Sequence, residues 1–150
     1  MEKLHLISAD TLFYQPLDHP KMLIDGILSN GLAILSGDSK IGKSWMVLWL
    51  CLKISRGEPV WGLPTAKTDV IYLALEDNDW RIQRRMQDLV DIPPDNLQFG
   101  FSCGKLGAEL EGQIKDVLDD NPNTGLLFID TLQMVRDNVS SRVNAYAQDY

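Results

Sequence analysis

The chain has 150 residues, of which 45% are hydrophobic and 23% charged, and its 11 glycines and 7 prolines gather in no low-complexity stretch. This length and composition are typical of one globular domain and exclude disordered, fibrous and multidomain proteins. The 14 Lys and Arg residues against 21 Asp and Glu residues give a net charge of −7, so no overall positive field attracts a nucleic-acid backbone. Any nucleic-acid contact is therefore expected to be local.

Neither a membrane span nor an export signal is found in the sequence. The apolar run Trp45–Leu52 is far shorter than the roughly 20 residues of a membrane helix, and the first residues lack a basic region followed by an apolar one. Cys51 lies inside that run and Cys103 lies between glycine-rich turns, with no metal-ligand spacing around either. We expect a soluble, cytoplasmic protein that contacts no membrane, with two cysteines that carry no chemistry.

Apolar runs predict strands and helices that alternate from residue 32 onward. Leu32–Ser36 is short, apolar and followed by glycine, which favours a strand buried on both faces. The apolar run 45–52 predicts an enclosed helix that ends at Arg56-Gly57. Val70–Leu75 predicts the next strand, and it runs into the acidic stretch Glu76–Asp79. A helix is expected to follow, with Asp77 as its cap.

The same alternation continues through the second half. The apolar positions Ile82, Met86 and Leu89 predict a helix that ends at Pro93-Pro94, and an apolar stripe over 110–118 predicts another that ends at Asn121-Pro122. Apolar runs predict strands over 97–101 and 126–130. These elements indicate an α/β fold, a three-layer core with a mainly parallel sheet, in a single domain over residues 1–150. Residues 1–20 are expected to be peripheral. Apolar positions between 139 and 150 indicate one more helix, so later core strands are expected beyond Tyr150.

One motif carries chemistry, and its residues are Gly37, Asp38, Ser39, Lys40, Ile41, Gly42, Lys43 and Ser44. They match G-x-x-x-x-G-K-[ST] between a predicted strand and a predicted helix. The backbone N–H groups of such a loop and of the following helix surround phosphate oxygens. Lys43 would neutralise β- and γ-phosphate charge, and Ser44 would offer its hydroxyl to Mg²⁺. A plain tight turn would not need Lys and Ser after the second glycine.

Two carboxylates follow predicted strands and belong at the same edge of a parallel sheet as the motif. Asp130 ends the run 126–130 and is the predicted Mg²⁺-linked carboxylate, although a strand-terminal Asp can also be a simple cap. Glu76 ends the run Val70–Leu75 and is the predicted general base that orients the attacking water. The alternative for Glu76 is a favourable charge near a helix N-terminus.

Four segments together carry a family resemblance, namely Leu35–Ser44, Tyr72–Asn78, Arg81–Met86 and Phe128–Leu132. They resemble RecA-like P-loop ATPases of the plasmid RepA hexameric-helicase type. The resemblance implies ATP and Mg²⁺ as ligands, phosphates at Gly42, Lys43 and Ser44, catalytic Glu76 and Lys43, and a metal-linked Asp130. It also implies a hexamer-like homo-oligomer in DNA replication, with sensor and arginine residues beyond Tyr150, so turnover by these 150 residues is expected to be weak.

The sequence therefore leaves three candidate functions. The first is Mg-dependent ATP hydrolysis by a helicase-type core, for which single-stranded DNA is a partner that the charge of the chain does not support. The second is a small P-loop kinase in which Arg81, Arg84 and Arg85 act as a clamp, although a solvated arginine face explains them equally. The third is a nucleotide-binding regulatory module without turnover.

Trp45 and Trp49 are expected to pack in the core.

Overall fold

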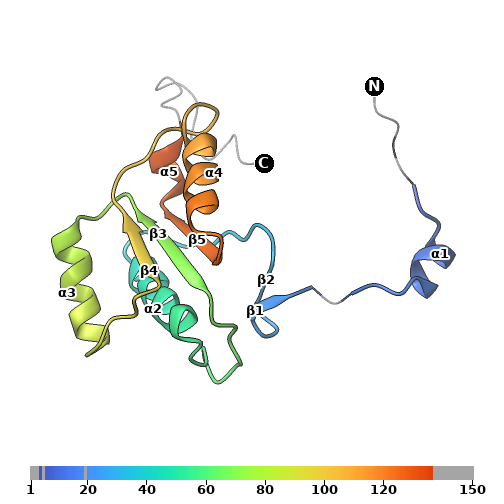
Figure 1. Cartoon of the computed structure of the whole chain (residues 1–150), viewed down its shortest axis with the longest axis horizontal. Coiled ribbons are helices and arrows are strands. Elements are labelled where there is room, and N and C mark those ends of the chain that lie inside the picture. The colour runs from blue at the N-terminus through green and yellow to red at the C-terminus, as the bar shows by residue number, and fades with distance from the viewer. Residues whose placement is uncertain (1–3, 5, 19, 137–150) are drawn as a thin grey trace.

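A three-stranded parallel sheet with helices on both faces forms the centre of the chain (Figure 1). The computed structural model describes residues 4, 6–18 and 20–136. In chain order its elements are α1 (Ala9–Tyr14), β1 (Met22–Ile24), β2 (Leu28–Ser29), α2 (Lys43–Arg56), β3 (Asp69–Ala74), α3 (Asp79–Leu89), β4 (Leu97–Gly100), α4 (Leu110–Asp120), β5 (Thr124–Asp130) and α5 (Leu132–Val135).

The central sheet has the strand order β4-β3-β5, with every pair parallel. Val70 of β3 lies opposite Leu97 on one side and Leu126 on the other, and Ala74 lies opposite Asp130. Parallel neighbours require crossover helices, which α3 and α4 provide. The α/β class and the parallel sheet predicted from the sequence are confirmed.

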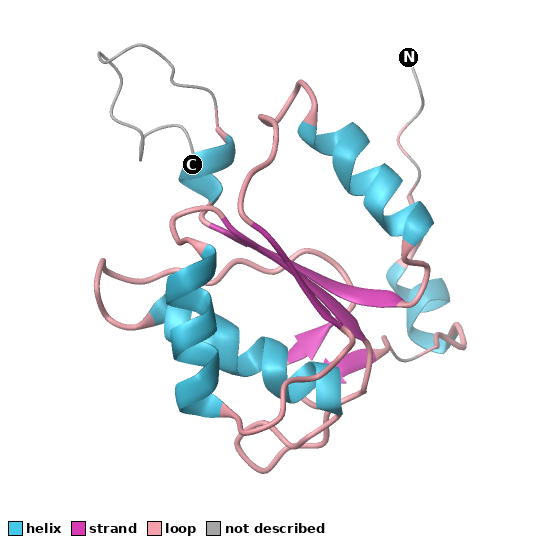
Figure 2. Ribbon diagram, turned by 60° about the vertical axis from the view of Figure 1, so that its left-hand side comes forward, coloured by secondary structure: helices cyan, strands magenta, loops and turns pink. Residues whose placement is uncertain are grey.

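Alternate residues of β3 face the two helical layers. Val70, Tyr72 and Ala74 belong to the core that β3 shares with α2 and with Ile82 of α3. Ile71 and Leu73 point to the opposite face, where they line a cavity beneath α4. Figure 2 shows α2 and α3 on one side of the strands and α4 on the other. The period of two along the strand therefore produces three layers.

The helix α2 is the central core helix, and its sequence explains both its burial and its end. Leu48, Cys51 and Ile54 are fully buried, as expected of a helix that is apolar on most sides. Gly57 ends it with φ +68° and a backbone N–H that caps the carbonyl of Ile54. A Cβ at Gly57 would lie 2.9 Å from Cβ of Lys67, so only glycine fits this left-handed cap. The predicted end at Arg56-Gly57 is confirmed.

The strand predicted over Leu32–Ser36 is wrong. These residues form no strand, and Leu32 and Ile34 are 95% and 77% exposed. A strand needs a neighbour for its backbone N–H and C=O groups, and within residues 20–136 the sheet ends at β5 without pairing to this segment. The phosphate motif therefore follows irregular chain instead of a buried strand.

The N-terminal segment that contains α1 lies apart from the sheet (Figure 1). The short helix α1 buries none of its residues, and Ser8 caps it by accepting from the backbone N–H of Thr11. The hairpin β1–β2 connects this segment to the body through Leu23, whose carbonyl accepts from Ala66 N. No helix in the described part of the chain is long and apolar enough to cross a membrane. The helix predicted over 139–150 lies outside the described residues.

Candidate functional site

The loop 37–42 leads directly into α2, and the first turn of that helix has no side-chain cap. Gly42 occupies the N-cap position with φ +94°, a left-handed conformation that glycine adopts without strain. The first turn contains no acidic residue. Since the first N–H groups of a helix lack intrahelical acceptors, those at the start of α2 are available to an external anion.

The ammonium of Lys43 spans the same loop. Its Nζ donates to the carbonyl oxygens of Gly37 at 2.7 Å and Asp38 at 2.6 Å. An ammonium has three N–H donors, so one donor remains beyond these two bonds. The loop is therefore closed around a positive charge at the uncapped helix end, the arrangement expected of a phosphate site.

The two predicted carboxylates lie at one edge of the sheet. Asp130 is the last residue of β5, and its carbonyl accepts from Leu75 N at 2.8 Å. Glu76 follows Leu75 and is exposed, and its Oε1 accepts from the hydroxyl of Thr131 at 3.0 Å. The structure thus brings Glu76 and Asp130 to the carboxyl edge, where Glu76 is bound by the residue that follows Asp130.

A buried tyrosine holds the carboxylate of Asp130. The hydroxyl of Tyr72 donates to Asp130 Oδ2 at 2.8 Å, while its ring, fully buried, packs against Phe99 and Phe128. Burial raises the pKa of Tyr72 well above its usual value, and the bond to Asp130 raises this pKa further. Tyr72 therefore remains a neutral donor that orients one oxygen of Asp130.

A chain of contacts joins the start of α2 to the segment after β3. The guanidinium of Arg85 lies 5.5 Å from the centre of the Trp45 ring, and it also pairs with Asp77. Arg81 Nη1 is 3.4 Å from the other oxygen of Asp77. Because Trp45 follows Ser44 and Asp77 follows Glu76, these contacts bring the phosphate motif and the predicted base to one region.

Two sequence predictions in this region are wrong. Asn78, not Asp77, caps α3, because its Oδ1 accepts from Arg81 N at 2.9 Å while the carboxylate of Asp77 turns to the arginines. Trp45 is 41% exposed instead of packing in the core. The core prediction holds for Trp49, which packs against the buried cluster and lies 5.6 Å from Trp61 between ring centres.

The residues present fit a phosphate group and a bound magnesium ion. The uncapped helix end and the free donor of Lys43 suit phosphate oxygens. Mg²⁺ is usually held by one or two protein oxygens together with phosphates and waters, and Ser44 and Asp130 are two such donors. No cluster of three or more His, Cys, Asp or Glu side chains suited to a metal occurs among the described residues.

Sequence reasoning missed Tyr72 and Thr131. A signal for Tyr72 existed, because a hydroxyl inside the apolar run Val70–Leu75 requires a buried hydrogen-bond partner. Thr131 follows Asp130 directly, but only the pairing of β3 with β5 brings its hydroxyl to Glu76. Both are polar groups whose partners lie more than 50 residues away.

Comparison with known families gives one match. A family model described as an AAA domain matches residues 2–148. The match includes the motif 37–44, Glu76 and Asp130. No curated protein and no solved structure matches the chain significantly.

Proposed function

The chain belongs to the family of AAA domains, and from this premise we propose that it is the RecA-like ATP-hydrolysing core of a helicase-type protein. Membership in this P-loop ATPase family gives the chain a nucleotide-binding function of the ATPase type. One observation carries the finer proposal. The uncapped start of α2, with Lys43 folded across its loop, is joined through Arg85 and Asp77 to the sheet edge that bears Glu76 and Asp130.

Each residue of the site has a role that follows from its surroundings. The N–H groups at the start of α2 and the ammonium of Lys43 would bind the β- and γ-phosphates. Ser44 and Asp130 would hold Mg²⁺, with Asp130 oriented by Tyr72. When bound, Mg·ATP supplies the phosphoanhydride bond and the divalent charge that offsets its developing negative charge.

Glu76 is the proposed general base. Its Oε1 accepts from Thr131, and no hydrogen bond to Oε2 is found in the described residues, so Oε2 is open to accept a proton from water. The Thr131 hydroxyl fixes the carboxylate in direction, as a base within hydrogen-bond reach of its water requires. Glu76 is exposed, which keeps it accessible to that water.

The remaining parts of the proposal rest on the resemblance. The segments that support the RepA type are residues 35–44, 72–78, 81–86 and 128–132. We therefore propose one RecA-like domain that works in a hexamer-like ring during DNA replication. The net charge of −7 gives no support to single-stranded DNA as a ligand of this chain. We therefore propose nucleotide turnover as its activity and DNA binding only within the assembled ring.

Binding is tested by calorimetric titration with Mg·ATP of the unaltered chain and of Lys43→Ala. Removing charge-assisted hydrogen bonds of about 1.5–3 kcal/mol predicts an affinity loss of about tenfold to a hundredfold. Lys53→Ala is the matched control, since Lys53 lies in the last turn of the same helix and pairs with Glu58. Its affinity for Mg·ATP should not change.

Turnover is tested by phosphate release from ATP in the unaltered chain and in Glu76→Gln. The variant should bind Mg·ATP normally and lose most phosphate release, since an amide cannot accept the proton.

In the binding test, equal affinity for Mg·ATP in Lys43→Ala and the unaltered chain would contradict the phosphate site. Tight binding with no phosphate release would favour the regulatory module, and transfer of phosphate to a small hydroxyl acceptor would favour a kinase.

A further inference from the structure

The N-terminal segment of residues 6–18 exposes a run of large apolar side chains. Those that are at least 47% exposed are Leu6, Ile7, Leu12, Phe13, Tyr14 and Leu17. The helix α1 within this segment has six residues, none of them buried. A helix this short is not stable in water unless it packs against another surface, and exposed apolar patches mark interaction sites. The segment therefore presents a surface for a partner.

The chemistry of α1 narrows the choice of partner. Asp10, Phe13 and Tyr14 stand at positions i, i+3 and i+4, so they share one face of the helix. The rings of Phe13 and Tyr14 meet edge to face, with 5.0 Å between their centres. Residues 6–18 include two aspartates and no lysine or arginine, so a nucleic-acid backbone or an anionic lipid surface repels them. The complementary surface combines an exposed aromatic ring with an unpaired cation.

Such a surface lies on α3, whose buried Ile82 faces the core. The opposite side of the helix is exposed, and we call its four residues the outer face of α3: Trp80, Gln83, Arg84 and Gln87. Trp80 is 62% exposed. Asp77 pairs with the two neighbouring arginines of the helix, whereas Arg84 makes no ion pair within residues 6–18 and 20–136. The outer face has no part in the proposed hydrolysis.

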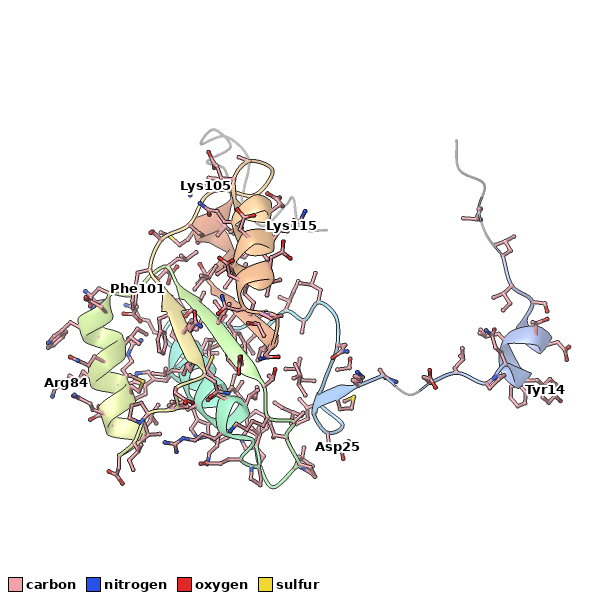
Figure 3. The ribbon with its side chains drawn as sticks, in the orientation of Figure 1. Tyr14, Asp25, Arg84, Phe101, Lys105 and Lys115 are labelled. Carbon is pink, nitrogen blue, oxygen red and sulfur yellow. The ribbon has the colours of Figure 1, made fainter. Side chains whose placement is uncertain are left out.

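The two surfaces lie far apart in one molecule. Figure 3 labels Tyr14 of α1 and Arg84 of α3 at opposite ends of the long axis. The hairpin β1–β2, which follows α1, is held to the body by a hydrogen bond from Asp25 N to the carbonyl of Pro64 at 2.9 Å. Contact between α1 and the outer face of α3 therefore joins different copies. Because the two surfaces differ, the contact is head-to-tail and repeats from copy to copy, which closes a ring or extends a filament.

We propose that α1 of one copy of this chain packs on the outer face of α3 in a second copy, with Phe13 and Tyr14 against Trp80 and with Asp10 beside Arg84. An aromatic side chain buries about 150–250 Å², so three rings bury roughly 750 Å² at most. A stable interface buries about 1,200–2,000 Å², so each contact is weak and association depends on concentration. The inference rests on the ring-forming part of the proposed function and assigns the surfaces that join its copies.

The test is sedimentation velocity over a range of concentrations, and the mean sedimentation coefficient of the unaltered chain should rise with concentration. Phe13→Ala should weaken association about tenfold to a hundredfold, because a buried aromatic ring is lost. Arg84→Glu should weaken it about threefold to tenfold, because a carboxylate then faces Asp10. Lys115→Glu is the matched control, since it makes the same change of charge at an exposed residue of α4. It should associate as the unaltered chain does.

Exchange of the two charges tests the pairing itself. Asp10→Lys and Arg84→Glu should each associate weakly alone, because every contact then joins like charges. A mixture of the two variants should associate again, because each contact between unlike copies joins opposite charges. A chain that carries both substitutions should also associate as the unaltered chain does. Misfolding of either variant cannot produce this recovery.

Several results would overturn the proposal. They are an unaltered chain that stays monomeric at every concentration, equal association in Phe13→Ala and the unaltered chain, and no recovery in the mixture. A change in the monomer's sedimentation in Phe13→Ala that does not depend on concentration would show α1 folded on its own chain, which also overturns it. The nucleotide site is tested separately, because Lys43→Ala should associate normally. Loss of Mg·ATP binding leaves this interface standing, and loss of association leaves the phosphate site standing.

Discussion

Replacing Tyr72 by phenylalanine removes one hydroxyl from the centre of the site. The hydroxyl donates to Asp130 Oδ2 at 2.8 Å, and the ring is fully buried between Phe99 and Phe128. Phenylalanine fills nearly the same volume, so no cavity opens and the ring contacts remain. The change therefore isolates a single hydrogen bond to a carboxylate.

The expected cost follows from the kind of bond that is lost. Hydrogen bonds to charged groups contribute about 1.5–3 kcal/mol. Phenylalanine has no hydroxyl to desolvate on folding, which offsets part of this loss. We therefore expect the free energy of unfolding to fall by about 1–2 kcal/mol. With a urea slope of about 2 kcal/mol per M, a loss of 1.5 kcal/mol lowers the unfolding midpoint by roughly 0.7 M. Tyr14→Phe is the control, since Tyr14 is 76% exposed and should leave the midpoint unchanged.

The pH dependence gives an independent check. In the folded chain the pKa of Tyr72 is raised above its ordinary value of 10.0, first by burial and then by Asp130. Below about pH 10 the tyrosine is protonated in both states and its contribution to stability is complete. Above about pH 10 the unfolded chain releases the proton and the folded chain keeps it, so this contribution falls by about 1.4 kcal/mol per pH unit.

Urea unfolding of the unaltered chain and of Tyr72→Phe, followed by circular dichroism from pH 7 to 11, measures both effects. The difference in unfolding free energy between the two should be constant to about pH 10 and then shrink as the unaltered chain alone loses this contribution. Equal stability at pH 7, or curves that stay parallel above pH 10, would refute the assigned hydrogen bond.

Two further predictions concern groups away from the site. Cys51 is fully buried, which raises the pKa of its thiol, whereas Cys103 is half-buried in a loop. An aromatic disulfide reagent at pH 8 should therefore modify Cys103 in the folded chain and Cys51 only in urea. Equal rates of modification at the two cysteines would contradict the packing of α2. Asn96 Nδ2 donates to the carbonyls of Ser55 at 2.9 Å and Thr68 at 3.0 Å. Asn96→Ala should lower the free energy of urea unfolding by about 1–3 kcal/mol. Asn96→Asp turns a carboxylate toward both carbonyls and should lower it further. A smaller loss in Asn96→Asp than in Asn96→Ala would refute the two hydrogen bonds.

Local patterns in the sequence were sufficient for most of the elements. The alternation of short apolar runs with helical stripes predicted α2, α3, α4 and the three parallel strands, because these patterns depend only on side-chain periodicity along one segment. The end of α2 at Gly57 was equally local, since a left-handed cap requires glycine. The motif 37–44 likewise predicted a phosphate site from residue types and spacing alone.

Other features depended on what lies beside a segment in space. Leu32–Ser36 has the composition of a buried strand, yet it is exposed because no neighbour in the described sheet pairs with it. Trp45 belongs to an apolar run but lies at the first turn of α2, where Arg85 and solvent surround it instead of the core. Periodicity cannot distinguish these surroundings, because it records the side chains of one segment and not those of its neighbours.

The sequence by itself determined the fold class, the phosphate motif and the two carboxylates at strand ends, since each is written in contiguous residues. Only the tertiary structure decided that Tyr72 holds Asp130, that Thr131 holds Glu76, and that Arg85 joins Asp77 to Trp45. The physical reason is the register of β3 with β5 and the packing of α3 on α2, which bring together groups that lie 8 to 58 residues apart.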